Sequence, residues 1–189
     1  MNTQTVSIYN VCRPSSRLME IPILLGFNLL LVTSAYISIN LPFSPVPITG
    51  QTFGVLLIAM ILGRVRGAAV VCAYLLEGAA GLPVFAGGKA GLVTLFGPTG
   101  GYLLGFAVAA FVAGSLADRG WDRSYLKSII AMTIGTAIIF LFGLSWLAKF
   151  VPELSLLTVG LTPFVPGAVL KISLAAVILP SLWKFIGQR

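Results

Sequence analysis

The chain has 189 residues, of which 58% are hydrophobic and 9% are charged, and its mean hydropathy is +1.02. A soluble globular domain carries about 25% charged residues, and a chain this apolar has too little polar surface to cover a water-exposed body. The composition therefore excludes a soluble protein. It predicts one compact membrane domain, since each span takes about 20 residues.

The net charge of +7 is unevenly placed. In a soluble protein such a balance suggests nucleic acid as a partner, but here the basic residues mark alternate breaks in the apolar pattern. Nine of the 12 lie at these breaks and near the two ends: Arg13, Arg17, Arg64, Arg66, Arg119, Arg123, Lys127, Lys184 and Arg189. Because cytoplasmic segments collect Lys and Arg, we expect an even number of spans, both termini in the cytoplasm and no nucleic-acid partner.

Residues 1–18 lack the pattern of a signal peptide, and we interpret them as a cytoplasmic tail before a single transmembrane domain, 19–189. Six apolar runs follow in chain order: 21–41, 52–62, 68–82, 102–116, 125–147 and about 163–183. The second run is too short to cross alone unless the residues from Ile48 join it. Since open sheet edges cannot persist in hydrocarbon, we predict an all-α integral membrane bundle of six transmembrane helices.

The residue types that are present limit the metal sites and the reactions that the chain could support. The chain has no His, which removes the commonest metal ligand and the commonest general base, so we expect neither a metal nor a cofactor. An intramembrane transferase or protease would need a paired acid and base, or a nucleophile with its base. Glu77 has no second carboxylate near it and Ser173 has no His, so the chain is not expected to be an enzyme.

Two ionisable residues fall within the apolar runs, where a charge costs about 2.5 to 3.5 kcal/mol on insertion scales. Lys171 follows Pro166 and Gly167 in the sixth run. A helix start or kink there would direct free N–H groups and the ammonium into one cavity, which favours an anion. Alternatively, Lys171 reaches the outer surface or pairs with Glu77 of the third run, whose carboxylate could instead accept hydrogen bonds from a ligand.

The connections on the predicted outer side combine apolar, polar and Gly-rich segments. The first holds Thr49, Gln51 and Thr52 beside three prolines, and the second, 84–101, interleaves glycines with aromatic residues. Bare backbone and aromatic faces could contact a small ligand there, although tight packing explains the glycines equally well. Lys89 in the second connection is either simply solvated or attracts a carboxylate. Together these connections predict a cavity that opens outward.

Five segments carry a resemblance to a known family: 46–54 (VPITGQTFG), 63–67 (GRVRG), 81–88 (GLPVFAGG), 97–102 (GPTGGY) and 163–171 (PFVPGAVLK). In this order, from about residue 20 to the end, they resemble BioY, the biotin-binding component of energy-coupling factor (ECF) transporters. The resemblance implies six membrane helices and a biotin pocket near the outer face. It also implies partners, namely a transmembrane coupling subunit and ATPase subunits, because this chain has no phosphate-binding loop of the Gly-x-x-x-x-Gly-Lys-Ser/Thr type.

The expected ligand contacts come from these motifs and from the interior charges: Thr49, Gln51, Glu77, Phe85, Gly87, Gly88, Lys89, Gly100, Gly101, Tyr102, Gly167, Ala168 and Lys171. The family often has an acidic residue after Pro-Gly in the last motif, where this chain has Ala168. The carboxylate of biotin would then meet Lys171 or Lys89. Glu77 becomes a candidate for the missing acid or for the ureido N–H groups.

The first run carries a pair of small residues four apart, Ser34 and Ser38, with Ala35 beside them. Such a pair serves either packing within one bundle or docking of another membrane subunit, and the resemblance implies docking.

The predicted function is that of a cell-membrane component that captures biotin from outside and releases it inside when an ATP-driven module reorients the bundle. The alternative is an assembly subunit without a small ligand, which would leave Lys171 and the Gly-rich connection unexplained.

Overall fold

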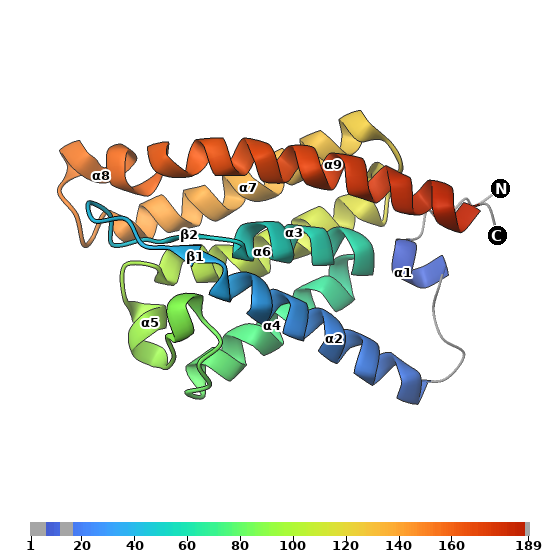
Figure 1. Ribbon diagram of the computed structural model, residues 1–189, viewed down its shortest axis with the longest axis horizontal. Helices are drawn as coiled ribbons and strands as arrows, with labels where there is room; N and C mark the ends of the chain where they lie inside the picture. The colour runs from blue at the N-terminus through green and yellow to red at the C-terminus, as the bar shows by residue number, and fades with distance from the viewer. Residues whose placement is uncertain (1–6, 12–16, 188–189) are drawn as a thin grey trace.

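Six helices of 12 residues or more make up most of the described chain (Figure 1). The structure is a computed structural model that describes residues 7–11 and 17–187. Its elements are α1 (Ile8–Val11), α2 (Arg17–Tyr36), β1 (Ser38–Ile39), β2 (Ile48–Thr49), α3 (Gln51–Leu62), α4 (Arg64–Ala79), η1 (Ala86–Gly88), α5 (Leu92–Phe96), α6 (Gly100–Ala117), η2 (Trp121–Arg123), α7 (Tyr125–Leu147), α8 (Glu153–Gly160), η3 (Thr162–Phe164) and α9 (Val165–Gly187).

The all-α prediction is confirmed, and each of the six apolar runs corresponds to one long helix. Within residues 7–11 and 17–187, four stretches are long and apolar enough to cross a membrane: Leu18–Tyr36, Gly100–Ala117, Tyr125–Leu147 and Ser155–Ile186. The second run forms α3, an apolar helix of only 12 residues, as its length suggested. The third forms α4, whose 16 residues include Arg64, Arg66 and Glu77.

The first run departs most from expectation, because its helix ends at Tyr36 rather than near residue 41. The chain then forms a short ribbon in which β1 and β2 pair antiparallel, with Ser38 opposite Thr49 and Ile39 opposite Ile48. Ser38 therefore lies on a strand rather than on the helix that carries Ser34. The ribbon places Thr49 beside the start of α3, at the end of the bundle that holds the cavity.

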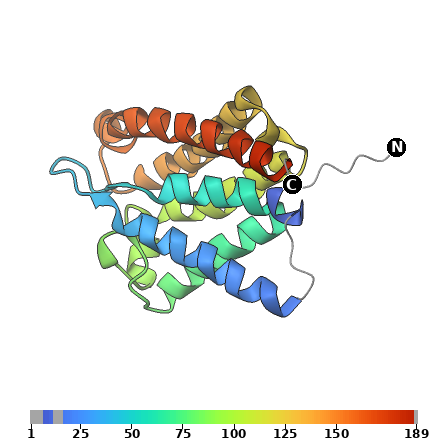
Figure 2. The same cartoon turned by 45° about the vertical axis from the view of Figure 1, so that its right-hand side comes forward.

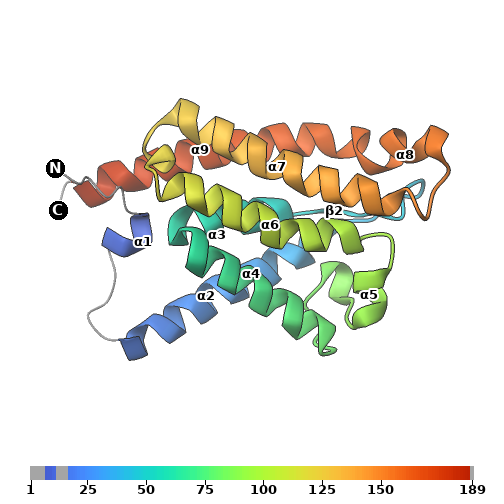
Figure 3. The same cartoon turned by 180° about the vertical axis from the view of Figure 1, so that it is seen from behind.

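Helix α6 occupies the centre of the bundle and packs against α3, α4 and α7 (Figure 3). It is apolar on all sides, as expected of a helix enclosed by neighbours, and 67% of its residues are buried. Its small residues allow close approach: Ala109, Ala110, Ala113 and Ala117 are fully buried. The N-terminal half of α6 carries Tyr102, Leu103 and Phe106, which line the cavity described below.

The two ends of the bundle differ in charge. α1, the turn from α3 to α4, η2 and the C-terminal part of α9 share one end, and the β ribbon, α5 and α8 share the other (Figures 1 and 2). The first end carries most of the basic residues that predicted the topology: Arg64, Arg66, Arg119, Arg123, Lys127 and Lys184. The tight turn there passes through Gly63, whose φ of +80° favours glycine, and the N–H of Arg64 donates to Asp118 Oδ2 at 3.1 Å.

The predicted tail, 1–18, lies mostly outside the described residues. Within its described part, Ile8 and Tyr9 of α1 are buried and α1 packs against α3. The ring of Tyr9 lies 4.9 Å beneath the guanidinium carbon of Arg66, which also forms an ion pair with Glu20. These contacts attach α1 to the basic end of the bundle.

Candidate functional site

A cavity lies at the end of the bundle opposite the basic end, between α3, α6, α7 and α9 and beneath the connections that follow α2 and α4. The space within its lining is about 910 Å³ when the open region at its mouth is included. Residues that line it come from five stretches of the chain, within 46–56, 85–89, 94–106, 132–140 and 164–172, so the cavity exists only once these parts of the bundle have come together.

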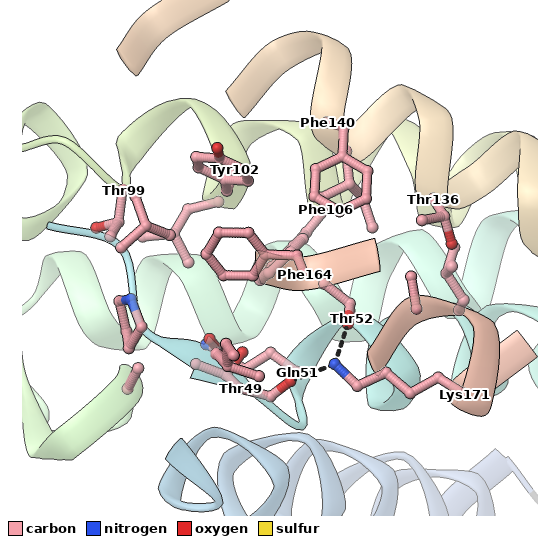
Figure 4. Close-up of a pocket in the computed structure, with 18 of the residues that line it drawn as sticks. Thr49, Gln51, Thr52, Thr99, Tyr102, Phe106, Thr136, Phe140, Phe164 and Lys171 are labelled. Atoms are coloured by element: carbon pink, nitrogen blue, oxygen red, sulfur yellow. Dashed lines mark hydrogen bonds between the residues drawn. The ribbon is translucent and has the colours of Figure 1, made fainter. Parts of the chain in front are cut away.

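Aromatic rings form the wall of the cavity that is nearest α6 and α7 (Figure 4). The ring centroids of Tyr102, Phe140 and Phe164 lie 6.3 to 6.4 Å apart in each pair, and Phe106 and Phe85 extend the same lining. The hydroxyl of Tyr102 donates to the carbonyl of Gly160 at 2.7 Å, which fixes the position of its ring in the lining. Such a wall suits a flat or puckered apolar ring system.

Lys171 supplies a positive charge to the lining of the cavity. Its Nζ donates to the carbonyl oxygen of Thr49 at 2.6 Å and to Thr52 Oγ1 at 2.9 Å (Figure 4). Both partners are neutral, and no carboxylate among the described residues pairs with this half-buried ammonium. An ammonium has three N–H donors, so one remains for a group in the cavity. A cation without a counter-ion inside a membrane domain favours an anionic ligand.

Lys89 is a second cation of the lining, and it differs from Lys171 in being exposed. It lies just after η1 in a loop closed by two backbone hydrogen bonds, from the N–H of Phe85 to the carbonyl of Lys89 and from the N–H of Gly88 to the carbonyl of Phe85, each 3.0 Å long. Its position fits a group that meets an anion at the mouth of the cavity.

Glu77 lies elsewhere. It accepts a hydrogen bond from Asn28 Nδ2 at 3.1 Å and does not line the cavity. The expectation that Glu77 contacts the ligand and the alternative that it pairs with Lys171 are both contradicted, because the side chain of Glu77 reaches α2 whereas Lys171 reaches the start of α3. The polar group that α4 does direct toward the cavity lining is Tyr74, one turn earlier.

Tyr74 links Gln51 to the loop that carries Phe85. Gln51 Nε2 donates to the hydroxyl of Tyr74, and that hydroxyl donates to the carbonyl of Val84 at 3.0 Å. Tyr74 is fully buried, and its ring meets that of Phe85 edge-on, with centroids 5.6 Å apart. The Phe85 ring fits against Gly78, where an added Cβ would lie 2.0 Å from Cζ of Phe85. The wall around Gln51 and Phe85 is therefore fixed on several sides.

The family model for BioY, described as the BioY family, matches residues 6–188. The chain belongs to the BioY family. It is 43% identical over 164 residues to the biotin transporter BioY of Thermotoga maritima, covering 86% of this chain and 95% of the relative. It is 39% identical over 149 residues to the biotin transporter BioY of Rhizobium etli, covering 74% and 79%.

A solved structure agrees with this membership. The crystal structure of the S-component for biotin from an ECF-type ABC transporter superposes with a TM-score of 0.77 at 26% identity, covering 90% of this chain and 95% of the solved one. The resemblance drawn from the five sequence segments is thereby confirmed, as is the ECF S-component fold.

Of the residues expected at the site of this BioY protein, seven line the cavity: Thr49, Gln51, Phe85, Lys89, Tyr102, Ala168 and Lys171. The glycines do not. Gly100 and Gly101 allow close packing, since a Cβ on either would lie within 2.4 Å of a backbone or side-chain atom of Leu95 or Trp146. Gly87 and Gly88 shape the turn of η1, and a Cβ on Gly167 would meet nothing within 4 Å. Their contribution is to backbone shape rather than to the lining.

The cavity also contains residues that the sequence did not single out as contacts, chiefly Phe106, Thr136, Phe140 and Phe164. Thr136 and Phe140 lie on α7, four residues apart and so on one helix face. The sequence signal that could have indicated this cavity face is a polar residue, Thr136, in line with Met132 and Phe140. This signal is weak, because threonines in membrane helices commonly bond to their own backbone.

The expected docking residues are covered by this chain itself. Ala35 is fully buried and Ser34 is 9% exposed, and the backbone and side chain of Ser34 lie against Gly50 and Gly54 of the following segment. Ser38 belongs to β1. These residues therefore do not form an exposed stripe on one helix, because the small side chains at 34 and 35 face α3 instead of lipid.

Proposed function

We propose that this protein captures biotin from the outer side of the cell membrane in the cavity of Lys171 and the aromatic wall, and that it releases the vitamin inward. The observation that carries this proposal is the ammonium of Lys171, bonded only to the neutral oxygens of Thr49 and Thr52 among the described residues. A monoanionic ligand with an apolar body complements such a site. The BioY relatives named as biotin transporters support the choice of biotin.

The parts of biotin match the parts of the cavity. Its carboxylate would accept the third N–H of Lys171, a charge-assisted bond. Its bicyclic ring would lie against the aromatic side chains of Tyr102, Phe140 and Phe164. Its ureido group would meet the polar side chains of Thr49, at the end of β2, and Gln51, at the start of α3. Lys89 at the mouth would attract the acid before it reaches Lys171.

The energy for transport would come from partners, in agreement with the ECF-type transporter that contains the solved S-component. We propose a transmembrane coupling subunit and a pair of ATPase subunits. The basic end of the bundle would face the cytoplasm, together with both termini and the tail, by the positive-inside rule. The domain of residues 19–189 would then act as one unit that reorients.

Binding of radiolabelled biotin to the purified protein in detergent tests the proposal. We expect saturable binding without turnover. Lys171→Met, which keeps length and apolar volume while removing the charge, should weaken binding about 10- to 100-fold, as expected for the loss of a hydrogen bond to a charged group. Absence of saturable binding to the folded parent would contradict the proposal and favour an assembly subunit.

A further inference from the structure

The direction of the hydrogen bonds around Tyr74 determines which end of the Gln51 amide faces the cavity. A carbonyl oxygen can only accept, so the bond of 3.0 Å between Tyr74 Oη and the carbonyl of Val84 uses the single proton of the hydroxyl. The hydroxyl can then only accept from Gln51. It follows that the amide nitrogen of Gln51 points at Tyr74, whichever way the amide is assigned from geometry alone.

The amide oxygen of Gln51 remains available as a hydrogen-bond acceptor. Among the described residues no donor bonds to this oxygen, and it is not sealed inside the protein. Because Gln51 lines the cavity and is otherwise buried at 4% exposure, the open side of the oxygen is the cavity. A buried acceptor of this kind is costly unless a donor meets it.

We propose that Tyr74 is a positioning residue that makes the site selective for a ligand with an N–H donor, by holding Gln51 with its oxygen toward the cavity. This inference rests on the proposed biotin function, in which the ureido group brings that N–H. Tyr74 does not itself line the cavity. It acts through Gln51, and without its hydroxyl the amide is free to rotate and present its NH₂ group, which cannot accept.

A matched control exists in the same loop. Tyr36 on α2 donates its hydroxyl to the carbonyl of Pro83 at 2.5 Å, one residue before the carbonyl that Tyr74 holds. Tyr36→Phe therefore removes a tyrosine bond to the same loop and leaves Gln51 untouched. Tyr74→Phe removes one loop bond and also the partner of Gln51. If Tyr74 served only to anchor the loop, Tyr74→Phe and Tyr36→Phe would have the same effect on ligand preference.

The test compares biotin with an analogue methylated on both ureido nitrogens, using equilibrium binding to the full chain in detergent. We expect Tyr74→Phe to lose about tenfold in affinity for biotin, the scale of one unmet buried hydrogen bond, and to lose little for the analogue. Tyr36→Phe should keep the preference of the parent. Equal losses for both ligands in Tyr74→Phe, or the same loss of preference in Tyr36→Phe, would overturn the proposal.

Gln51→Ala provides a second line of evidence, which does not depend on whether Tyr74→Phe folds. We expect Gln51→Ala to lose the preference for biotin over the analogue, and Tyr74→Phe to cost nothing further in that background, because the two residues act as one unit. A Gln51→Ala protein that retains the full preference contradicts the inference. Failure of the parent to bind biotin contradicts the proposed function instead, so the two failures are distinguishable.

Discussion

The half of the bundle that holds the cavity and the half at the basic end are built from the same helices, but different side chains lie between those helices. The cavity half holds the rings, threonines and Lys171 that line the cavity. In the basic half, backbones meet across small residues, and a Cβ added at Gly67 would lie 2.7 Å from Cα of Ala59. Backbones also approach closely in the cavity half, where a Cβ on Gly101 would lie 2.4 Å from the carbonyl oxygen of Phe142. What sets the two halves apart is therefore the cavity and its lining, and not the close approach of helix backbones.

A substitution that forces the closely packed backbones of the basic half apart should have the largest effect on stability. In Gly114→Val the new Cβ would lie 2.6 Å from Cα and N of Arg64, which are backbone atoms that cannot rotate away. We expect a loss of about 3 kcal/mol or more in the free energy of unfolding, at the upper end for overpacked sites, measured by thermal unfolding in detergent.

Gly26→Ala is the matched control for Gly114→Val. Gly26 lies in α2, and a Cβ there would meet nothing within 4 Å. The substitution should stabilise the helix by about 0.5 to 1 kcal/mol. Similar melting temperatures for the two variants would contradict the account of close backbone packing at the basic end.

The basic end also holds a buried carboxylate, which predicts a pH dependence of stability. Burial raises the pKa of Asp122 from 3.8 to about 6, although the indole N–H of Trp183 opposes this at 2.6 Å from Oδ2. A raised pKa means that the folded state binds the proton more tightly. The contribution to stability is then fully present below about pH 4 and is lost as the pH rises through about 6.

We expect the free energy of unfolding to fall by on the order of 2 kcal/mol across this interval. Asp122→Asn should flatten the dependence, because the amide does not titrate. The measurement is chemical or thermal unfolding of both proteins between pH 4 and pH 7. An unchanged pH profile in Asp122→Asn would show that another group is responsible.

The sequence predicted the helices well and the cavity in part, and the difference has a physical basis. Apolar runs bounded by charges or prolines report local preferences, and 125–147 coincided with α7. The lining depends on which face of each helix turns inward. Thr133 and Thr136 look alike in sequence, yet Thr133 is exposed and bonds to the carbonyl of Ile129 at 2.8 Å, whereas Thr136 lines the cavity.

Residues in and near the connections show the same limit on what can be predicted from the sequence. Phe85 was found because it lies within the segment 81–88, and Lys89 because it is a charged residue in the Gly-rich connection; both line the cavity. The alternative in which Glu77 pairs with Lys171 failed, because Glu77 contacts Asn28 of α2 instead, and this contact joins residues 49 positions apart in the chain. Spacing along one run cannot reveal such a pair, since it depends on how two helices cross.

Altering the exposed mouth should have the smallest effect. Lys89→Gln removes a charge from an exposed position, and we expect biotin affinity to fall only a few-fold, since exposed pairs contribute about 1 kcal/mol or less. The loss should be visible at low ionic strength and disappear at high ionic strength, because salt screens exposed charges. A large, salt-independent loss would move the main anion contact from Lys171 to the mouth.

The most direct test of the central claim compares biotin with biotinol, the alcohol that lacks the carboxylate, on the parent, Lys171→Met and Lys89→Gln. If the acid of the ligand meets Lys171, the parent should prefer biotin about 30-fold, in keeping with a charge-assisted hydrogen bond. That preference should vanish in Lys171→Met and persist in Lys89→Gln. A Lys171→Met protein that still prefers the acid by the same factor would contradict the account.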